Sequence, residues 1–149
     1  MKAKDNYYRK IEGILHNVPK LRIEIDNLKL DLEEIEEIMG IHGQSGNVAA
    51  GSSTYAFNST VENEVIDRDE TLQDKRKKIN ASISKAERKL KRIENNLQIL
   101  SESEMLLVEL KYFKNYTNAR VCDVLDISDS GLTKRRKRII VEKLMPLSW

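Results

Sequence analysis

The stretch IEGILHNVPKLRIEIDNLKLDLEEIEEIM, residues 11–39, decides the fold because its apolar residues recur in alternating steps of three and four. They are Ile11, Ile14, Val18, Leu21, Ile25, Leu28, Leu32, Ile35 and Met39. An apolar repeat of this period is typical of the packing seam of a coiled coil. We therefore expect a long helix from about residue 5 to residue 39. Pro19 lacks a backbone N–H and restricts Val18, so a kink or two stacked helices are expected there.

A second long helix is expected after a break in the periodicity. Residues 41–58, IHGQSGNVAAGSSTYAFN, are rich in Gly, Ser and Asn, as is usual for a flexible linker. Ser59 and Glu62 then fit a capping box, which marks a helix start. The apolar stripe of this helix comprises Val61, Val65, Leu72, Ile79, Ile83, Ala86, Leu90, Ile93, Leu97 and Leu100.

The two expected helices carry charges of opposite sign. Residues 21–39 hold seven acidic and two basic residues, whereas residues 72–96 hold nine basic and three acidic ones. Charges flanking a seam select the partner helix, while the apolar seam supplies most of the stability. The pattern predicts that residues 1–100 form an antiparallel coiled-coil hairpin with the linker, at about 41–58, at its tip. A homo-oligomer that pairs the same surfaces is equally permitted.

Residues 101–149 are expected to form a small separate domain of short helices. Ser101 and Glu104 fit a second capping box, and two further helical segments start near Thr117 and Ser128. The whole chain is thus expected to be all-α, with a long antiparallel coiled-coil helical hairpin followed by a small C-terminal helix-turn-helix bundle.

Residues 117–137 meet most of the requirements of a DNA-binding helix-turn-helix. That motif needs an apolar inner face on both helices and a tight turn between them. Thr117 and Ser128 are placed to cap the two helices. The expected core comprises Val121, Cys122, Leu125, Ile127, Leu132 and Ile139.

The basic run from Lys134 to Arg138 divides when it is projected onto a helix. Facing away from the apolar side, and so expected to read base edges, are Ser130, Thr133, Lys134 and Lys137. Expected to contact the DNA backbone are Thr117, Ser128, Arg136 and Arg138. Arg135 falls three residues after Leu132, where an apolar side chain is usual, so we expect its stem to snorkel outward. Asp129 is placed to help the cap or to accept from a cytosine amino group.

The stretch VCDVLDISDSGLTKRRKRII, residues 121–140, with ELKYFKN, residues 109–115, resembles the C-terminal helix-turn-helix of the RinA and ArpU phage late-gene regulators. More loosely, it is similar to the promoter-reading fourth region of sigma factors. YYRKIEGILHNVPKLRIEI and SSTYAFNSTVENEVI stand where that family has an N-terminal helix and a linker. Asp126 and Cys122 depart from the Gly and Ala that many members carry there.

That resemblance implies an activator of phage or prophage late genes for packaging, morphogenesis or lysis. It would bind double-stranded promoter DNA in the cytoplasm of a bacterial host, with host RNA polymerase as a further candidate partner. A small-terminase-like packaging subunit and a coiled-coil adaptor without specific DNA readout remain alternatives, because both use similar parts.

Other classes of function find little support in the sequence. A net charge of +2 does not by itself imply a nucleic-acid partner, so the distribution of charge carries that argument. The single cysteine, Cys122, excludes an intramolecular disulfide, and no apolar run approaches the length of a membrane span. No phosphate loop, nucleophile elbow or metal-ligand cluster is present, so we expect no enzyme activity, cofactor or metal.

Overall fold

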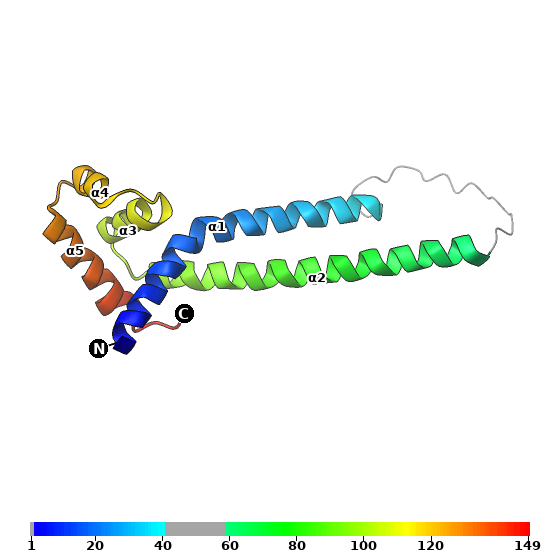
Figure 1. Ribbon diagram of the computed structural model, residues 1–149, viewed down its shortest axis with the longest axis horizontal. Helices are drawn as coiled ribbons and strands as arrows, with labels where there is room; N and C mark the ends of the chain where they lie inside the picture. Colours follow the sequence, from blue (N-terminus) through cyan, green and yellow to red (C-terminus); the bar gives the residue numbers. More distant parts are fainter. Residues whose placement is uncertain (1, 41–58) are drawn as a thin grey trace. The chain divides into compact units, whose positions relative to one another are not determined.

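The computed structural model describes residues 2–40 and 59–149, with side chains of the second range described from residue 70 onward. All regular structure in these residues is helical, which confirms the all-α class (Figure 1). In chain order the elements are α1 (Lys2–Ile38), α2 (Ser59–Leu97), α3 (Glu102–Val108), η1 (Glu109–Phe113), α4 (Asn118–Leu125), α5 (Asp129–Lys137) and η2 (Arg138–Leu144). The expected linker and the side chains of the Ser59 and Glu62 capping box lie outside the described residues.

Pro19 lies inside α1, which is one continuous helix rather than two stacked ones. The ribbon of α1 changes direction within its N-terminal half (Figure 1), as expected for a helix interrupted by proline. Val18 and Leu21, on either side of Pro19, are both buried. Packing of these side chains stabilises the helix and offsets the hydrogen bond that proline cannot donate.

The chain divides into two compact units. Unit 1 comprises Met1–Ile23 and Glu87–Trp149, and unit 2 comprises Glu24–Ala86. This division differs from the boundary expected near residue 100, because the N-terminal part of α1 belongs with the short C-terminal helices. Ile11, Leu15 and Val18 are buried in unit 1, so this part of α1 contributes to the core of that unit.

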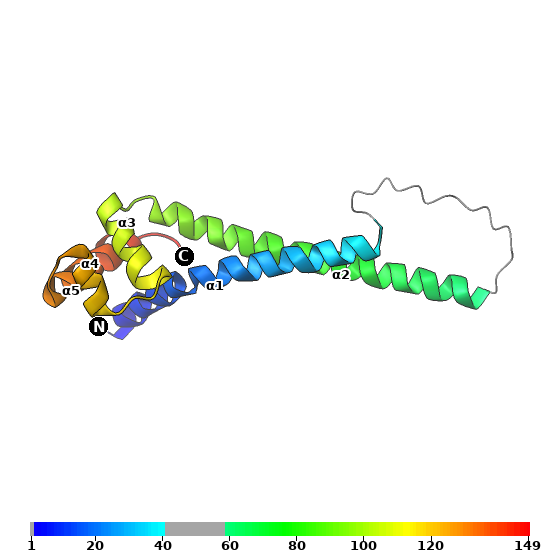
Figure 2. The same ribbon diagram turned by 90° about the horizontal axis from the view of Figure 1, so that it is seen from above.

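In unit 2, α1 and α2 run in opposite directions (Figures 1 and 2). Arg76 on α2 donates from Nε to Glu36 Oε1 on α1 at 3.2 Å. Ile25 and Ile83 are buried, and the other seam side chains described in this unit are half-buried. The apolar seam therefore faces inward, as the heptad spacing predicts.

The core of unit 1 joins five helical regions, which are α1, α2, α3 with η1, α4, and α5 with η2. Its buried side chains are Ile11, Leu15, Val18, Leu21, Ile93, Leu97, Leu107, Val108, Leu110, Tyr112, Val121, Cys122, Leu132, Ile139, Ile140 and Leu144. Within this unit Arg22 on α1 pairs with Glu94 on α2 at 3.6 Å. The short helices are thus stabilised by burial against α1 and each other, since helices of this length are marginal alone.

Two π-helical segments continue the short helices. In η1 the Lys114 N–H donates to Glu109 O at 2.8 Å, and after η2 the Met145 N–H donates to Ile140 O at 2.8 Å. These bonds span five residues rather than four, so each turn is wider and the apolar spacing shifts. The apolar spacing of residues 105–113 differs from that of the α2 seam, because α2 ends at Leu97 and a new helix begins at Glu102.

Candidate nucleic-acid interface

Two capped helices and a tight turn form residues 117–137. Thr117 Oγ1 accepts from the Arg120 N–H at 3.3 Å, and α4 follows. Asp126 ends α4 in the left-handed conformation, with φ 53° and ψ 52°. Ser128 Oγ then accepts from the Gly131 N–H at 3.1 Å and starts α5. Both predicted caps are confirmed, and Asp126 adopts the left-handed backbone conformation at the turn, which aspartate tolerates better than most residues.

The inner faces of α4 and α5 are largely apolar. Val121, Cys122, Leu132 and Ile139 are buried, while Leu125 and Ile127 are half-buried. All six residues predicted for the core of this segment are therefore at least partly removed from solvent.

A polar contact also joins the two helices across the turn. Cys122 Sγ donates to Asp129 Oδ1 at 3.3 Å, so the Asp129 carboxylate faces α4. Burial raises the pKa of the Cys122 thiol, and the carboxylates of Asp129 and Asp123 raise it further. A thiol that stays protonated is a weak nucleophile, so Cys122 is a packing residue rather than a reactive one.

The outer face of α5 carries the four side chains predicted to read bases. Ser130, Thr133, Lys134 and Lys137 are all exposed, whereas Leu132 on the opposite face is 1% exposed. Thr133 and Lys137 line a shallow groove together with Lys4 and Tyr8 of α1. The exposed surface of α5 is therefore continuous with the first turns of α1.

The structure reverses the expected orientation of Arg136, whereas Arg135 points outward, the direction expected for its stem. Arg135 is exposed, and with Arg138 it lines a depression beside α3. Arg136 instead turns inward, one helical turn after buried Leu132, and only 20% of its side chain is exposed. Positions three and four residues apart both share a helix face, so the helical period alone does not choose between residues 135 and 136, and the contacts of Arg136 with Tyr112 and Glu12 decide which one turns inward.

Arg136 is held by partners on α1 and η1. Its Nη2 pairs with Glu12 Oε1, its Nε donates to the Tyr112 hydroxyl at 3.3 Å, and that hydroxyl donates to Glu12 Oε1 at 2.8 Å. Burial raises the pKa of Tyr112 well above its ordinary value. His16 lies edge-on to the Tyr112 ring, with centroids 4.8 Å apart. Arg136 is therefore removed from the expected set of DNA-backbone contacts.

The sequence did not single out Glu12 or Tyr112. Glu12 follows seam residue Ile11 and resembles the other solvated charges of the helix, and Tyr112 lies in a segment of irregular apolar spacing. One signal was available, because a tyrosine in a largely apolar segment needs a hydrogen-bond partner when buried. The identity of that partner depends on residues distant in sequence.

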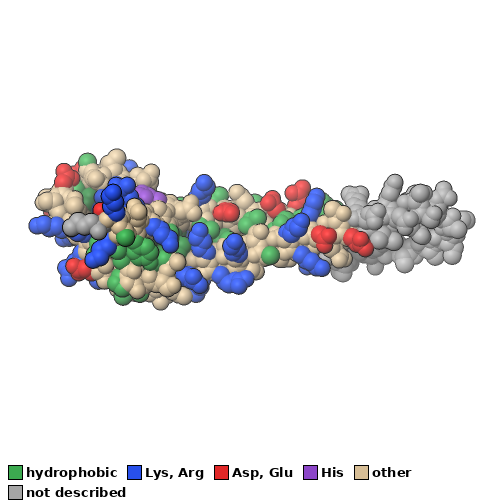
Figure 3. Space-filling view, turned by 60° about the horizontal axis from the view of Figure 1, so that its bottom comes forward, with side chains coloured by type: hydrophobic (Ala, Val, Ile, Leu, Met, Phe, Trp, Pro, Cys, Tyr) green, Lys and Arg blue, Asp and Glu red, His purple; other side chains and the backbone are tan. Residues whose placement is uncertain are grey.

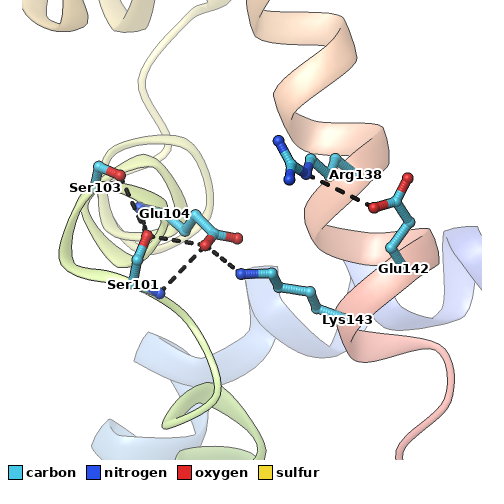
Figure 4. Close-up of polar contacts among 6 residues, drawn as sticks. All are labelled: Ser101, Ser103, Glu104, Arg138, Glu142 and Lys143. Atoms are coloured by element: carbon cyan, nitrogen blue, oxygen red, sulfur yellow. Dashed lines mark hydrogen bonds and ion pairs between the residues drawn. The ribbon is translucent and has the colours of Figure 1, made fainter.

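Arg138 and Lys143 differ in how firmly they are held (Figure 4). Arg138 faces Glu142 at 3.7 Å, and both side chains are largely exposed, at 72% and 67%. Lys143 pairs with Glu104, whose Oε1 also accepts from the Ser101 backbone N–H at 3.3 Å and so completes the predicted capping box. Exposed pairs are weak, so Arg138 can exchange Glu142 for another anion, whereas Lys143 attaches η2 to α3.

Among the side chains that the structure describes, in residues 2–40 and 70–149, no group of three or more His, Cys, Asp and Glu is arranged to hold a metal ion. None of the helices in those ranges combines the length and apolarity needed to cross a membrane. His42 lies outside the described residues.

Comparison with known proteins finds no matching family model, no matching curated protein and no matching solved structure.

Proposed function

We propose that the chain is a sequence-specific DNA-binding transcriptional activator whose α5 enters the major groove of a duplex. The observation that carries the proposal is the two-faced character of α5. Ser130, Thr133, Lys134 and Lys137 are exposed along it, and Leu132 is buried on the other side. In helix-turn-helix proteins the second helix presents such a polar face to base edges, while its apolar face packs on the first helix.

The exposed side chains have the donors that base recognition requires. Lys134 and Lys137 can donate to the O6 and N7 acceptors of guanine, and Ser130 and Thr133 can donate or accept. Thr133 already donates to Asp129 O at 3.0 Å, which holds its methyl group and oxygen in one orientation. The Thr133 methyl group can therefore contact a thymine methyl group, and the Thr133 oxygen can accept a hydrogen bond from a base amino group.

Contacts with the DNA backbone come from residues at the edges of the exposed face of α5. Arg138 has only an exposed ion pair to give up, and exposed Arg135 lies beside it in the depression next to α3. Thr117 and Ser128 accept cap hydrogen bonds, and the Thr117 hydroxyl keeps a proton that it can donate to a phosphate oxygen. The Ser128 hydroxyl can do the same when Ser130 is the donor in the 3.1 Å hydrogen bond between the two hydroxyls. Arg136 instead holds α5 in place, because its contacts attach α5 to α1 and η1.

The biological setting rests on the resemblance to the RinA and ArpU regulators. We propose that the target is a promoter of phage or prophage late genes, and that host RNA polymerase and a second copy of the chain are partners. Activation rather than repression follows from that resemblance alone.

Selection of bound sequences from a random duplex pool tests the reading of bases. The full chain should enrich one motif, and Lys134→Ala should weaken binding to it by about 1–3 kcal/mol while random duplex is affected far less. Arg138→Ala should weaken both duplexes alike and lower the salt slope by roughly one unit. Lys20→Ala, which removes an exposed lysine of α1, is the matched control and should leave both affinities unchanged. Failure to enrich any motif, or equal losses on both duplexes for Lys134→Ala, would contradict the proposal.

A further inference from the structure

The C-terminal part of α2 carries cations that helix pairing does not use. The opposite charges of the two long helices predict ion pairs between them, and Arg22 with Glu94 is such a pair in unit 1. Lys91 and Arg92 are exposed, and neither forms an ion pair with any residue that the structure describes. Ion pairing between the long helices therefore does not account for the positive charge of Lys91 and Arg92.

These two residues belong to a shallow depression on unit 1. It is lined by Arg88, Lys91, Arg92, Asn95, Asn96 and Ser148. The five residues of α2 fall at helical spacing on one side of the helix, opposite buried Ile93 and Leu97. Lys and Arg side chains gather over this part of α2 in Figure 3.

The lining has a chemistry suited to anions. It contains three cationic side chains, two amides and a hydroxyl, and it contains no acidic side chain. Asn96 Nδ2 donates to Ser148 O at 2.9 Å, so the C-terminal segment is held against α2 and closes one side of the depression.

The lining of this depression contains no apolar side chain, which favours a phosphate-bearing partner over a protein surface. Protein interfaces have an apolar core enriched in aromatic residues, and this depression offers none. Phosphate contacts require only cations and hydrogen-bond donors, and the arginine guanidinium matches phosphate oxygens in two-point contacts.

We propose that Lys91 and Arg92, supported by Arg88 and Asn95, bind the phosphate backbone of duplex DNA as a second contact surface of the chain. The inference rests on the proposed function in that DNA is the partner, and it assigns this partner to a surface separate from α5. Because the surface contacts phosphates alone, it strengthens binding to every sequence and reads none of them.

The test compares two double variants with equal loss of charge. Lys91→Gln/Arg92→Gln removes the proposed contacts, and Lys75→Gln/Lys89→Gln removes two exposed lysines of α2 that do not line the depression. Binding of the full chain to the selected duplex and to a random duplex is measured by fluorescence anisotropy over a range of salt concentrations. The helical content of each variant is checked by circular dichroism.

We expect Lys91→Gln/Arg92→Gln to weaken both duplexes by the same factor and to lower the salt slope by roughly two units. Lys75→Gln/Lys89→Gln should leave the slope near that of the wild type. Equal slopes for the two variants would overturn the inference, because net charge alone would then account for binding. Tighter binding of polyglutamate than of duplex, lost in Lys91→Gln/Arg92→Gln, would also overturn it in favour of an acidic protein partner.

The same binding assay distinguishes failure of the α2 phosphate contacts from failure of base recognition by α5. If Lys134→Ala binds the selected duplex as wild type does, the reading function fails while a reduced slope for Lys91→Gln/Arg92→Gln still supports the α2 surface. If Lys134→Ala loses sequence preference and Lys91→Gln/Arg92→Gln retains the full slope, only the α2 surface is overturned.

Discussion

Arg136 on α5 and Glu12 on α1 form an ion pair although 124 residues separate them in the sequence. The Tyr112 hydroxyl contacts both partners and adds a third helix to the same network. A network that joins three helices sets the position of α5 in unit 1 and thereby the direction in which Ser130 and Lys134 face.

Loss of one partner from this network should destabilise the protein. Arg136→Met leaves Glu12, whose side chain is 20% exposed, without its cation, and should lower the free energy of unfolding by about 2–3 kcal/mol. Glu12→Leu/Arg136→Met should cost less than the sum of the single changes, because the double variant leaves no unpaired charge. Urea unfolding of the four proteins measures the coupling.

The ion pair between Arg138 and Glu142 is the matched control for this double-mutant cycle of Glu12 and Arg136. Both side chains are largely exposed, so their coupling should stay below about 0.5 kcal/mol. Couplings of equal size for the two pairs would show that the inward network does not stabilise α5 specifically.

The left-handed backbone at Asp126 should tolerate only certain side chains. At φ 53°, Asp126→Gly and Asp126→Asn should retain wild-type stability within about 0.5 kcal/mol, whereas Asp126→Val should lose about 1–2 kcal/mol. Thermal unfolding is the measurement. Asp123→Val, at an exposed position within α4, should cost much less, and a similar loss at both positions would exclude backbone strain as the cause.

Stability should fall in acid through Glu104. Burial raises the pKa of its carboxyl, but the hydrogen bonds from Lys143 and Ser101 together lower the pKa by more than burial raises it. The pKa of Glu104 in the folded protein therefore lies below the ordinary 4.5. A pKa lowered on folding contributes stability above the unfolded pKa, and this contribution is lost as pH falls through the folded pKa. Unfolding measured below about pH 4.5 should therefore show a loss that Glu104→Gln reduces. Glu142→Gln, which alters an exposed carboxylate of η2, should keep the wild-type profile.

Asp129 should slow the modification of Cys122. Its carboxylate accepts the thiol hydrogen bond and helps raise the thiol pKa, so less thiolate is present at a given pH. Asp129→Asn should speed alkylation by iodoacetamide and shift the rate profile to lower pH. Asp123→Asn should have the same direction of effect but a smaller one, because Asp123 makes the smaller contribution to the pKa. Unchanged rates in Asp129→Asn would mean that burial alone protects the thiol.

Much of the local structure followed from the sequence. The two seams, the caps at Ser101, Thr117 and Ser128 and the turn at Asp126 were all predicted, because each depends on residues within one or two helical turns. The exposure of the four proposed base-reading residues also agrees with the helical projection, although their role on DNA stays a prediction. Leu15 was missed, since it lies beside the heptad seam, yet its side chain is fully buried.

The sequence by itself determined the helical class, the helix starts of the C-terminal segment and the two-faced character of α5. Tertiary structure alone decided which arginine turns inward, that the first part of α1 belongs with the C-terminal helices, and that Lys91 and Arg92 stay unpaired within the described residues. The reason is the range of the interactions. Caps and apolar periods act between near neighbours, whereas the direction of Arg136 depends on where folding brings Glu12 and Tyr112.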